Sequence, residues 1–265
     1  MVKSLWTDAR EALVEQFEYR ELLYQMIARD LLLRYKQTAM GFGWAIFMPL
    51  VNTAVFSVIF TKVAPIQTAV PYPVFAFTGL LAWNFLASSL RFSVVALTSN
   101  ANLVTKVYFP REIFPFSAVA VCLVDFAVGS LVLVALMVWY QIPVGPNLLW
   151  LPLVVVVHVL FTAACALVLA MANLFYRDVK YLFEVVVSAW MFATPVLYPF
   201  DGIGGTLGVL LHLNPMTPII DSYRAVLLFD APPAALGPVA GIASIVLAIA
   251  WLSFHRLEFQ FAENI

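Results

Sequence analysis

The sequence predicts an all-α membrane protein with six transmembrane helices, an N-terminal amphipathic interface helix and short re-entrant helices between spans five and six. The 265-residue chain is 63% hydrophobic and only 11% charged, whereas a soluble domain carries about a quarter charged residues. Its apolar runs are long and unbroken, while the strands of a membrane β-barrel alternate in short segments. A helical, multi-pass membrane protein is therefore expected.

Residues 1–36 are expected to form the interface helix, and residues 37–265 the transmembrane domain. Apolar side chains recur on one face of the first segment at helical spacing, and charged side chains lie mostly opposite. The apolar face comprises Leu13, Phe17, Tyr24, Ile27, Leu31 and Tyr35. This helix either rests on the membrane surface alone or also docks a cytosolic partner, and the residues leave both interpretations open.

Charges, prolines and glycines divide the transmembrane domain into spans. No charged residue occurs between Lys36 and Lys62, which is long enough for a helix that crosses about 30 Å of hydrocarbon. The uncharged run from Phe126 to Tyr176 is too long for one crossing, and the turn at 143–147 divides it. The predicted spans cover residues 41–61, 74–92, 116–140, 148–173, 181–199 and 236–254.

The segment 202–220 is apolar but contains several glycines together with Pro215 and Pro218. Irregular backbone at membrane depth is tolerated only inside protein or along a cavity. We therefore expect short re-entrant or surface helices here. A seventh crossing in this segment would move only the C-terminal tail to the other side.

The basic residues predict the orientation, because cytoplasmic flanks carry an excess of Lys and Arg. Of the 14 lysines and arginines, only Lys62 and Arg224 fall on the predicted outer side. Both termini are therefore expected in the cytoplasm.

The sequence contains no recognisable motif for nucleotide binding, metal binding or catalysis. The Gly41-Phe42-Gly43 stretch lacks both a preceding strand and a following Gly-Lys-Ser/Thr, so it is not a nucleotide site. The two cysteines have no paired spacing and the three histidines are far apart in sequence. We expect no catalytic residue, metal or cofactor in this chain, and the net charge of −1 gives no reason to expect nucleic acid.

Asp125 is the one acid deep within a predicted span. An intramembrane acid is a functional candidate by default. Because the sequence shows no relay partner for it, we favour a structural carboxyl that is hydrogen-bonded to a neighbouring helix or protonated.

Aromatic residues make up 15% of the chain. Most are expected in the core or toward lipid, but some could line a passage, because sugar rings can stack on aromatic faces. The candidate passage residues are Trp44, Phe47, Trp190 and Tyr198. By physical argument alone, the bundle could be a permease subunit, a channel or a membrane-embedded enzyme.

Several motifs resemble the type-2 ABC exporter permeases that move polysaccharides. The stretch from Arg29 to Trp44 reads Arg-Asp-Leu-x-x-Arg-Tyr-Lys-Gln-x-x-x-Gly-x-x-Trp and is similar to the family's first signature. Residues 102–115 and 173–179 resemble its two cytosolic loops, and the similarity covers nearly the whole chain in the right order. Further similar segments are Thr194–Pro199, Asn214–Thr217 and the pair Tyr223-Arg224.

The resemblance implies a homodimer in the bacterial cytoplasmic (inner) membrane, surrounded by lipid, with two copies of a separate cytosolic ABC ATPase that bind ATP and Mg²⁺. It implies export of an O-antigen, capsule or teichoic-acid glycan on a polyprenyl diphosphate carrier, and so a part in lipopolysaccharide biosynthesis or a similar pathway. The broken outer segment is implied to form gating helices. The outer-gate residues would be Asn214, Pro215, Tyr223 and Arg224.

ATP energy would reach such a bundle through its cytosolic elements, namely the N-terminal helix and the loops 98–115 and 176–180. The longer loop places aromatic residues beside charges, as suits an element that enters a partner's cleft. Alternatively, it is a solvated loop whose charges only set the topology. The expected ATPase contacts are Arg29, Asp30, Lys106, Tyr108, Phe109, Arg111, Glu112, Arg177 and Asp178.

Two other functions compete with glycan export. An exporter permease for a drug or lipid is the alternative within the family, although the loop motifs favour glycans. A multi-pass membrane glycosyltransferase or acyltransferase would need a polar catalytic cluster at a membrane face. The outer face offers for this only Asp201, Asp221 and Asp230, with no histidine or second basic partner nearby.

Overall fold

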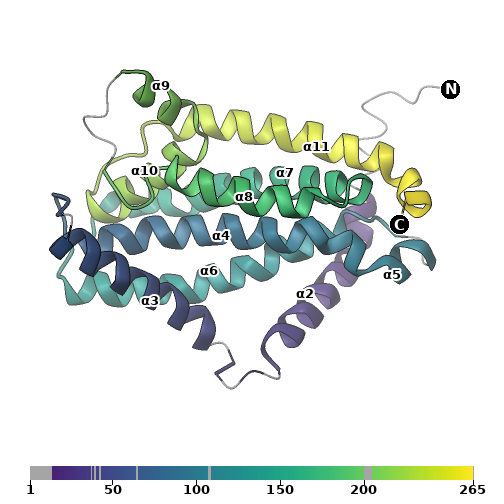
Figure 1. Cartoon of the computed structure of the whole chain (residues 1–265), viewed down its shortest axis with the longest axis horizontal. Coiled ribbons are helices and arrows are strands. Elements are labelled where there is room, and N and C mark those ends of the chain that lie inside the picture. Colours follow the sequence, from purple (N-terminus) through teal and green to yellow (C-terminus); the bar gives the residue numbers. More distant parts are fainter. Residues whose placement is uncertain are drawn as a thin grey trace.

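The computed structural model describes residues 14–36, 38, 40–41, 43–63, 65–106, 109–199 and 205–264. Within these parts the chain folds into helices joined by turns, without strands (Figure 1). The expected all-helical class is confirmed.

Five helices in the described residues are long and apolar enough to cross a membrane. Two of them include a shorter turn: α3 continues into the π-helical turn η1, and α7 follows the 3-10 turn η2. They are α3 (Gly43–Val58) with η1 (Ile59–Val63), α4 (Tyr72–Ser99), α6 (Ile113–Trp139), η2 (Pro146–Trp150) with α7 (Leu151–Phe175), and α11 (Leu236–Asn264).

The other helices are shorter and join or cover these five. They are α2 (Arg20–Tyr35), α5 (Ala101–Lys106), α8 (Val179–Phe192), α9 (Gly205–Leu213) and α10 (Met216–Leu228). Helix α8 occupies the predicted fifth span but has only 14 residues. Its helix stops before Pro195, which has no amide hydrogen to donate and clashes with the preceding turn.

Helix α4 is the centre of the bundle. In its most apolar stretch 72% of the residues are buried, whereas the corresponding value for the span that contains α3 is 6%. Figure 1 shows α4 running between α8 and α6, with α3 alongside. The main core therefore forms around α4, and α3 presents most of its apolar side chains to the outside.

A second apolar cluster joins both ends of the described chain. It contains residues of α2, of the end of α4, of α5 and the stretch that leads into α6, of α7 and of α11: these include Met26, Leu97, Val104, Phe109, Phe114, Leu174, Phe254 and Phe261. We call this end of the bundle the inner end. The opposite end, which contains η2, α9 and α10, is called the outer end, in keeping with the predicted orientation.

Helix α9 and the start of α10 fall within the segment 202–220, where short re-entrant helices were expected, and α10 continues beyond it to Leu228. Residues 202–204 of that segment lie outside the described part. Helix α10 packs against α4, α7, α11 and η2, and most of its side chains are buried. It is therefore part of the core of the outer end.

Candidate functional site

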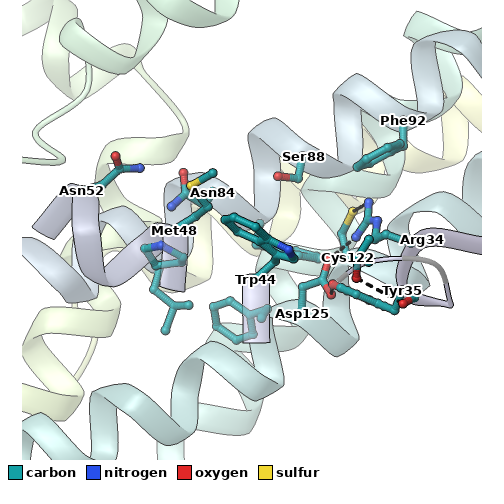
Figure 2. Close-up of a pocket in the computed structure, with 15 residues that line it drawn as sticks. Arg34, Tyr35, Trp44, Met48, Asn52, Asn84, Ser88, Phe92, Cys122 and Asp125 are labelled. Atoms are coloured by element: carbon teal, nitrogen blue, oxygen red, sulfur yellow. Dashed lines mark hydrogen bonds and ion pairs between the residues drawn. The ribbon is translucent and has the colours of Figure 1, made fainter. Parts of the chain in front are cut away.

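A cavity of about 420 Å³ lies where the chain passes from α2 into α3 (Figure 2). Four elements build it: the end of α2, the first half of α3, the middle of α4 and the middle of α6. Its walls combine aromatic, amide, hydroxyl and charged groups. The lining residues are Arg34, Tyr35, Thr38, Trp44, Met48, Pro49, Asn52, Leu81, Asn84, Phe85, Ser88, Phe92, Cys122, Asp125 and Phe126.

Asp125 is held by the motif that ends α2. The Arg34 guanidinium forms an ion pair with one carboxylate oxygen, and the Tyr35 hydroxyl donates a hydrogen bond to the other. Figure 2 shows both side chains converging on Asp125. The Arg34 guanidinium also lies 4.0 Å from the centroid of the Phe92 ring. The ion pair is partly open to solvent, since the two side chains are 21% and 23% exposed.

This contact corrects one step of the sequence reasoning. No partner for Asp125 was evident, yet its partners lie 91 and 90 residues upstream, at the end of α2. The favoured interpretation, a carboxyl bonded to a neighbouring helix, fits the geometry. Burial raises the pKa of Tyr35 to about 12, so its hydroxyl keeps its proton and remains a donor at neutral pH.

One face of α4 contributes both polar and aromatic groups to the cavity wall. Asn84, Ser88 and Phe92 recur every four residues and therefore lie one above another on the helix. Asn52 of α3 adds a second amide (Figure 2). Sequence reasoning assigned these groups no role, although amides within apolar spans were a usable signal, because polar groups in lipid are costly unless they face a cavity or partner.

The four expected passage residues separate into two groups. Trp44 and Phe47 lie together on α3 with ring centroids 5.8 Å apart, and Trp44 lines the cavity described above. Trp190 and Tyr198 instead line a second, mainly apolar cavity of about 620 Å³ beside α9. The structure therefore brings each pair together but does not join the pairs in one site.

Asn214 ties the end of α8 to the start of α10. Its side-chain oxygen accepts hydrogen bonds from Trp190 Nε1 at 3.0 Å and from the Met216 amide at 3.1 Å. Its side-chain nitrogen donates to the Ala193 carbonyl at 3.1 Å and to Thr194 Oγ1 at 2.7 Å. Together with Pro215, which precedes the first residue of α10, this residue sets the position of the broken segment.

Arg224 is buried in the outer end, with 3% of its surface exposed. It donates hydrogen bonds to the carbonyls of Pro195 at 2.7 Å and Val196 at 2.6 Å, and its guanidinium lies 3.7 Å from the centroid of the Phe75 ring. The turn after α8 frees these carbonyls from helical bonding, so the arginine satisfies groups that the broken helix leaves unpaired.

Two further contacts fix this region. The Tyr223 hydroxyl lies 3.3 Å from Nδ1 of the buried His158. Gly79 of α4 leaves room for the turn, because a Cβ at this position would clash with the Val196 carbonyl oxygen and lie 2.7 Å from Arg224 Nη2. Of the expected outer-gate residues, Tyr223 and Arg224 are thus part of a packed, hydrogen-bonded core.

The expected ATPase contacts also divide by position. Lys106, Arg177 and Asp178 are exposed. Arg29 and Asp30 are half-buried and ion-paired with each other at 2.8 Å.

Other members of that set turn inward. Phe109 is 4% exposed and packs against Phe114, with ring centroids 5.5 Å apart. Glu112 is fully buried, and Arg111 donates to the carbonyls of Val104 and Glu258.

Direct contact of Phe109 or Glu112 with a partner does not fit this arrangement, because both side chains are buried. The sequence of a loop does not show which of its side chains will pack into the core. Tyr108 lies outside the described residues, and the partner role of the exposed residues stays a prediction.

The fold and the site together describe a helical, multi-pass membrane protein with a polar cavity between its helices. Residues 21–228 match the family model described as ABC-2 type transporter. The chain belongs to this family, and it is accordingly a transporter membrane subunit rather than an enzyme.

Curated relatives cover nearly the whole chain. It is 33% identical over 257 residues to an O-antigen export system permease protein RfbA of Myxococcus xanthus, covering 95% of this chain and 98% of the relative. Two proteins of the same name from Klebsiella pneumoniae are each 29% identical, and each match covers 92% of this chain and 94% of the relative.

Proposed function

We propose that this chain is the transmembrane permease subunit of an ATP-driven ABC exporter that moves a lipid-linked polysaccharide of the O-antigen class across the inner membrane. The observation that carries this proposal is the near full-length similarity to relatives named O-antigen export permeases, at 33% identity in the first case. The same names favour a glycan over a drug or lipid as the cargo.

The cavity has a chemistry that suits a glycan. Its aromatic wall, Trp44, can stack on the apolar face of a sugar ring, and Asn52, Asn84 and Ser88 can exchange hydrogen bonds with sugar hydroxyls. Arg34 supplies a cation at the inner side of the cavity, where a diphosphate carrier would enter. A wall that combines aromatic, amide and hydroxyl groups can contact a polar polymer at many points without binding it tightly at any one of them. A passage requires such weak, distributed binding.

We infer six crossings with both termini in the cytoplasm. Both ends of the described chain meet in the inner-end cluster, and an odd number of crossings would separate them. Helix α8 supplies the sixth crossing: it starts after the turn that follows α7 at the inner end, and its far end is tied by Asn214 to the outer end. At about 1.5 Å per residue its helix covers about 21 Å, and the turn at 193–199 completes the distance.

A homodimer is the assembly that this monomer suits. Helix α3 exposes large apolar side chains along its length and buries few of them against the rest of the chain. It also forms one wall of the cavity. A second copy that packs across α3 would close the cavity into a passage between subunits. The exposed inner-end residues Lys106, Arg177 and Asp178 would then face two copies of the cytosolic ATPase, which would bind ATP and Mg²⁺.

Export can be tested in a strain that lacks its own permease. The chain, co-expressed with its ATPase, should restore surface glycan, whereas omission of either protein should leave lipid-linked glycan inside the cell. Restoration by the chain without any ATPase would contradict the proposal. So would the failure of correctly inserted chain and ATPase to export an O-antigen, a capsule or a teichoic-acid glycan, each tested in a suitable strain.

The role of the cavity can be tested at Trp44. Loss of one stacking contact is worth about 1 kcal/mol, so Trp44→Ala should slow export about fivefold, while Trp44→Phe should retain most of the rate. Trp139→Ala is the matched control, because that side chain is exposed at the outer end, far from the cavity lining. Equal export by Trp44→Ala and the control would remove Trp44 from the passage.

Topology and partner contact need separate tests. After replacement of Cys122 and Cys165, a cysteine at Leu149 should react with an impermeant thiol reagent from outside, and a cysteine at Arg177 should not. Outside labelling at position 177 would overturn the orientation.

Contact with the ATPase can be tested at the same position. Arg177→Glu should weaken capture of the ATPase, and Lys62→Glu at the outer end is the control.

A further inference from the structure

Three groups that can ligate a metal meet at the inner end, far from the cavity lining. Glu112 precedes the first residue of α6, and His255 and Glu258 lie on α11. One ligand atom from each residue lies within 4.8 Å of the others. His255 and Glu258 are three positions apart, which places both on one face of the helix. Metal ligands in helical bundles use the same spacing.

Both carboxylates are withdrawn from solvent and incompletely bonded. Glu112 is 0% exposed and Glu258 is 3% exposed. The Oε2 atom of each makes no hydrogen bond to the described residues, and neither does His255 Nδ1, which lies 3.5 Å from Glu112 Oε1. Buried carboxylates are costly unless a cation or donors compensate them, so two such oxygens beside a ring nitrogen require an explanation.

The neighbouring donors leave both Oε2 atoms unbonded, and Arg111 Nε likewise has no hydrogen-bond partner among the described residues. Arg111 directs its two terminal nitrogens to the main-chain carbonyls of Glu258 and Val104, not to either carboxylate. Trp251 Nε1 donates to Glu112 Oε1 at 3.1 Å, which orients this carboxylate and leaves its Oε2 free. An outer hydrogen bond that orients a ligand in this way is typical of metal sites.

We propose that Glu112, His255 and Glu258 form a binding site for one divalent transition-metal ion of the Zn²⁺ class. One imidazole nitrogen and two carboxylate oxygens are ligands that Zn²⁺ accepts, with water at the remaining position. The ion would balance the two buried negative charges. It would also join α11 to the segment between α5 and α6, so that the inner end becomes one rigid unit. The site does not depend on what the protein exports.

The site escaped sequence reasoning because its members are dispersed. Histidines that are far apart in sequence gave no ligand pattern, and Glu112 was expected to contact the ATPase as part of a cytosolic loop. Only the packing of α11 against the start of α6 brings the three together.

Zn²⁺ binding can be measured on the purified full chain without a histidine tag, because a tag would bind the same ion. After treatment with a chelator and its removal, calorimetric titration with Zn²⁺ should show about one ion per chain with a Kd in the micromolar range or below, and the Tm should rise with Zn²⁺. Absence of both binding and a Tm shift in the wild-type chain would overturn the proposal.

Variants should locate the ion. His255→Ala and Glu258→Gln should lose stoichiometric binding, while Glu21→Gln, an exposed acid of α2, should bind as the wild type does. If either ligand variant fails to fold, Trp251→Phe provides the second test: it removes only the orienting hydrogen bond and should weaken binding about 10- to 100-fold.

Retained full affinity in all three site variants would place the ion elsewhere and refute the assignment. The assignment would also be refuted if the wild-type chain bound no Zn²⁺ and Glu258→Gln raised its Tm, because the two carboxylates would then share a proton instead. Both outcomes leave the export proposal intact, since neither measurement involves transport.

Discussion

Two arginines of the bundle, Arg34 and Arg224, are held by different means. Partly exposed Arg34 is paired with the carboxylate of Asp125 in the middle of α6, a contact we call the inner pair, and buried Arg224 at the outer end is bonded to the carbonyls of Pro195 and Val196. Each guanidinium also lies over a phenylalanine ring. An arginine therefore forms an ion pair in one place, and another arginine caps main-chain carbonyls in the other.

The difference indicates which of the two contacts can move more readily. The carbonyl acceptors of Arg224 belong to a turn that is fixed on both sides, and its side chain is 4% exposed. The Arg34 pair is partly open to solvent, and Arg34 belongs to α2, a helix that packs chiefly against α6. An ion pair near water can break and exchange its partners for solvent at modest cost, whereas buried carbonyls have no alternative donor. We therefore expect α2 to shift more readily than the turn after α8.

The largest effect should come from Arg224→Met. This change keeps an unbranched side chain but leaves the two carbonyls without their donor, which should destabilise the protein by about 3 kcal/mol. Thermal unfolding of the detergent-solubilised protein measures the effect. Arg91→Met is the matched control, because Arg91 is an exposed arginine of α4 whose ion pair leaves both side chains nearly half exposed. Equal losses for the two variants would contradict the capping role.

Gly79→Ala should be the next most harmful change. The added methyl group would meet the Val196 carbonyl and the Arg224 guanidinium, and overpacking of this kind costs about 1 to 3 kcal/mol. Gly241→Ala is the control, since a Cβ at that position meets nothing within 4 Å. A Gly79→Ala protein as stable as the control would show that the turn can relax.

A double-mutant cycle tests the inner pair. Asp125→Asn and Arg34→Gln should each destabilise the contact between α2 and α6, and the double variant should lose less than the sum of the two. We expect a coupling free energy of about 1 to 2 kcal/mol, measured by thermal unfolding. Additive losses would mean that the pair contributes nothing beyond its separate side chains.

The smallest effect is expected at the pair that joins α4 to α8. Arg91 and Glu184 make two hydrogen bonds, at 2.8 and 2.9 Å, yet both side chains are exposed. An exposed pair is worth about 0.5 kcal/mol or less, so Glu184→Gln should scarcely change the Tm at moderate salt. A loss comparable with that of the inner pair would indicate that this surface is buried, for example by a second subunit.

The sequence by itself was sufficient for the class of protein and the approximate position of its long helices. Runs such as 41–61 and 116–140 could be recognised because hydropathy is a local, additive property, and the basic residues predicted the orientation. The motif from Arg29 to Trp44 indicated the family for the same reason, since it is continuous in the chain.

The tertiary structure decided which side chains meet. Asp125 found its partners about ninety residues upstream, and Phe109, expected on the surface, turned into the core. Helix α8 proved shorter than its apolar run, because the helix ends before Pro195 and Arg224 of α10 bonds to the carbonyls of the turn that follows. Such outcomes depend on the rotation of each helix about its axis and on which neighbour covers it. Those are properties of packing between distant segments, and no local pattern of residues encodes them separately.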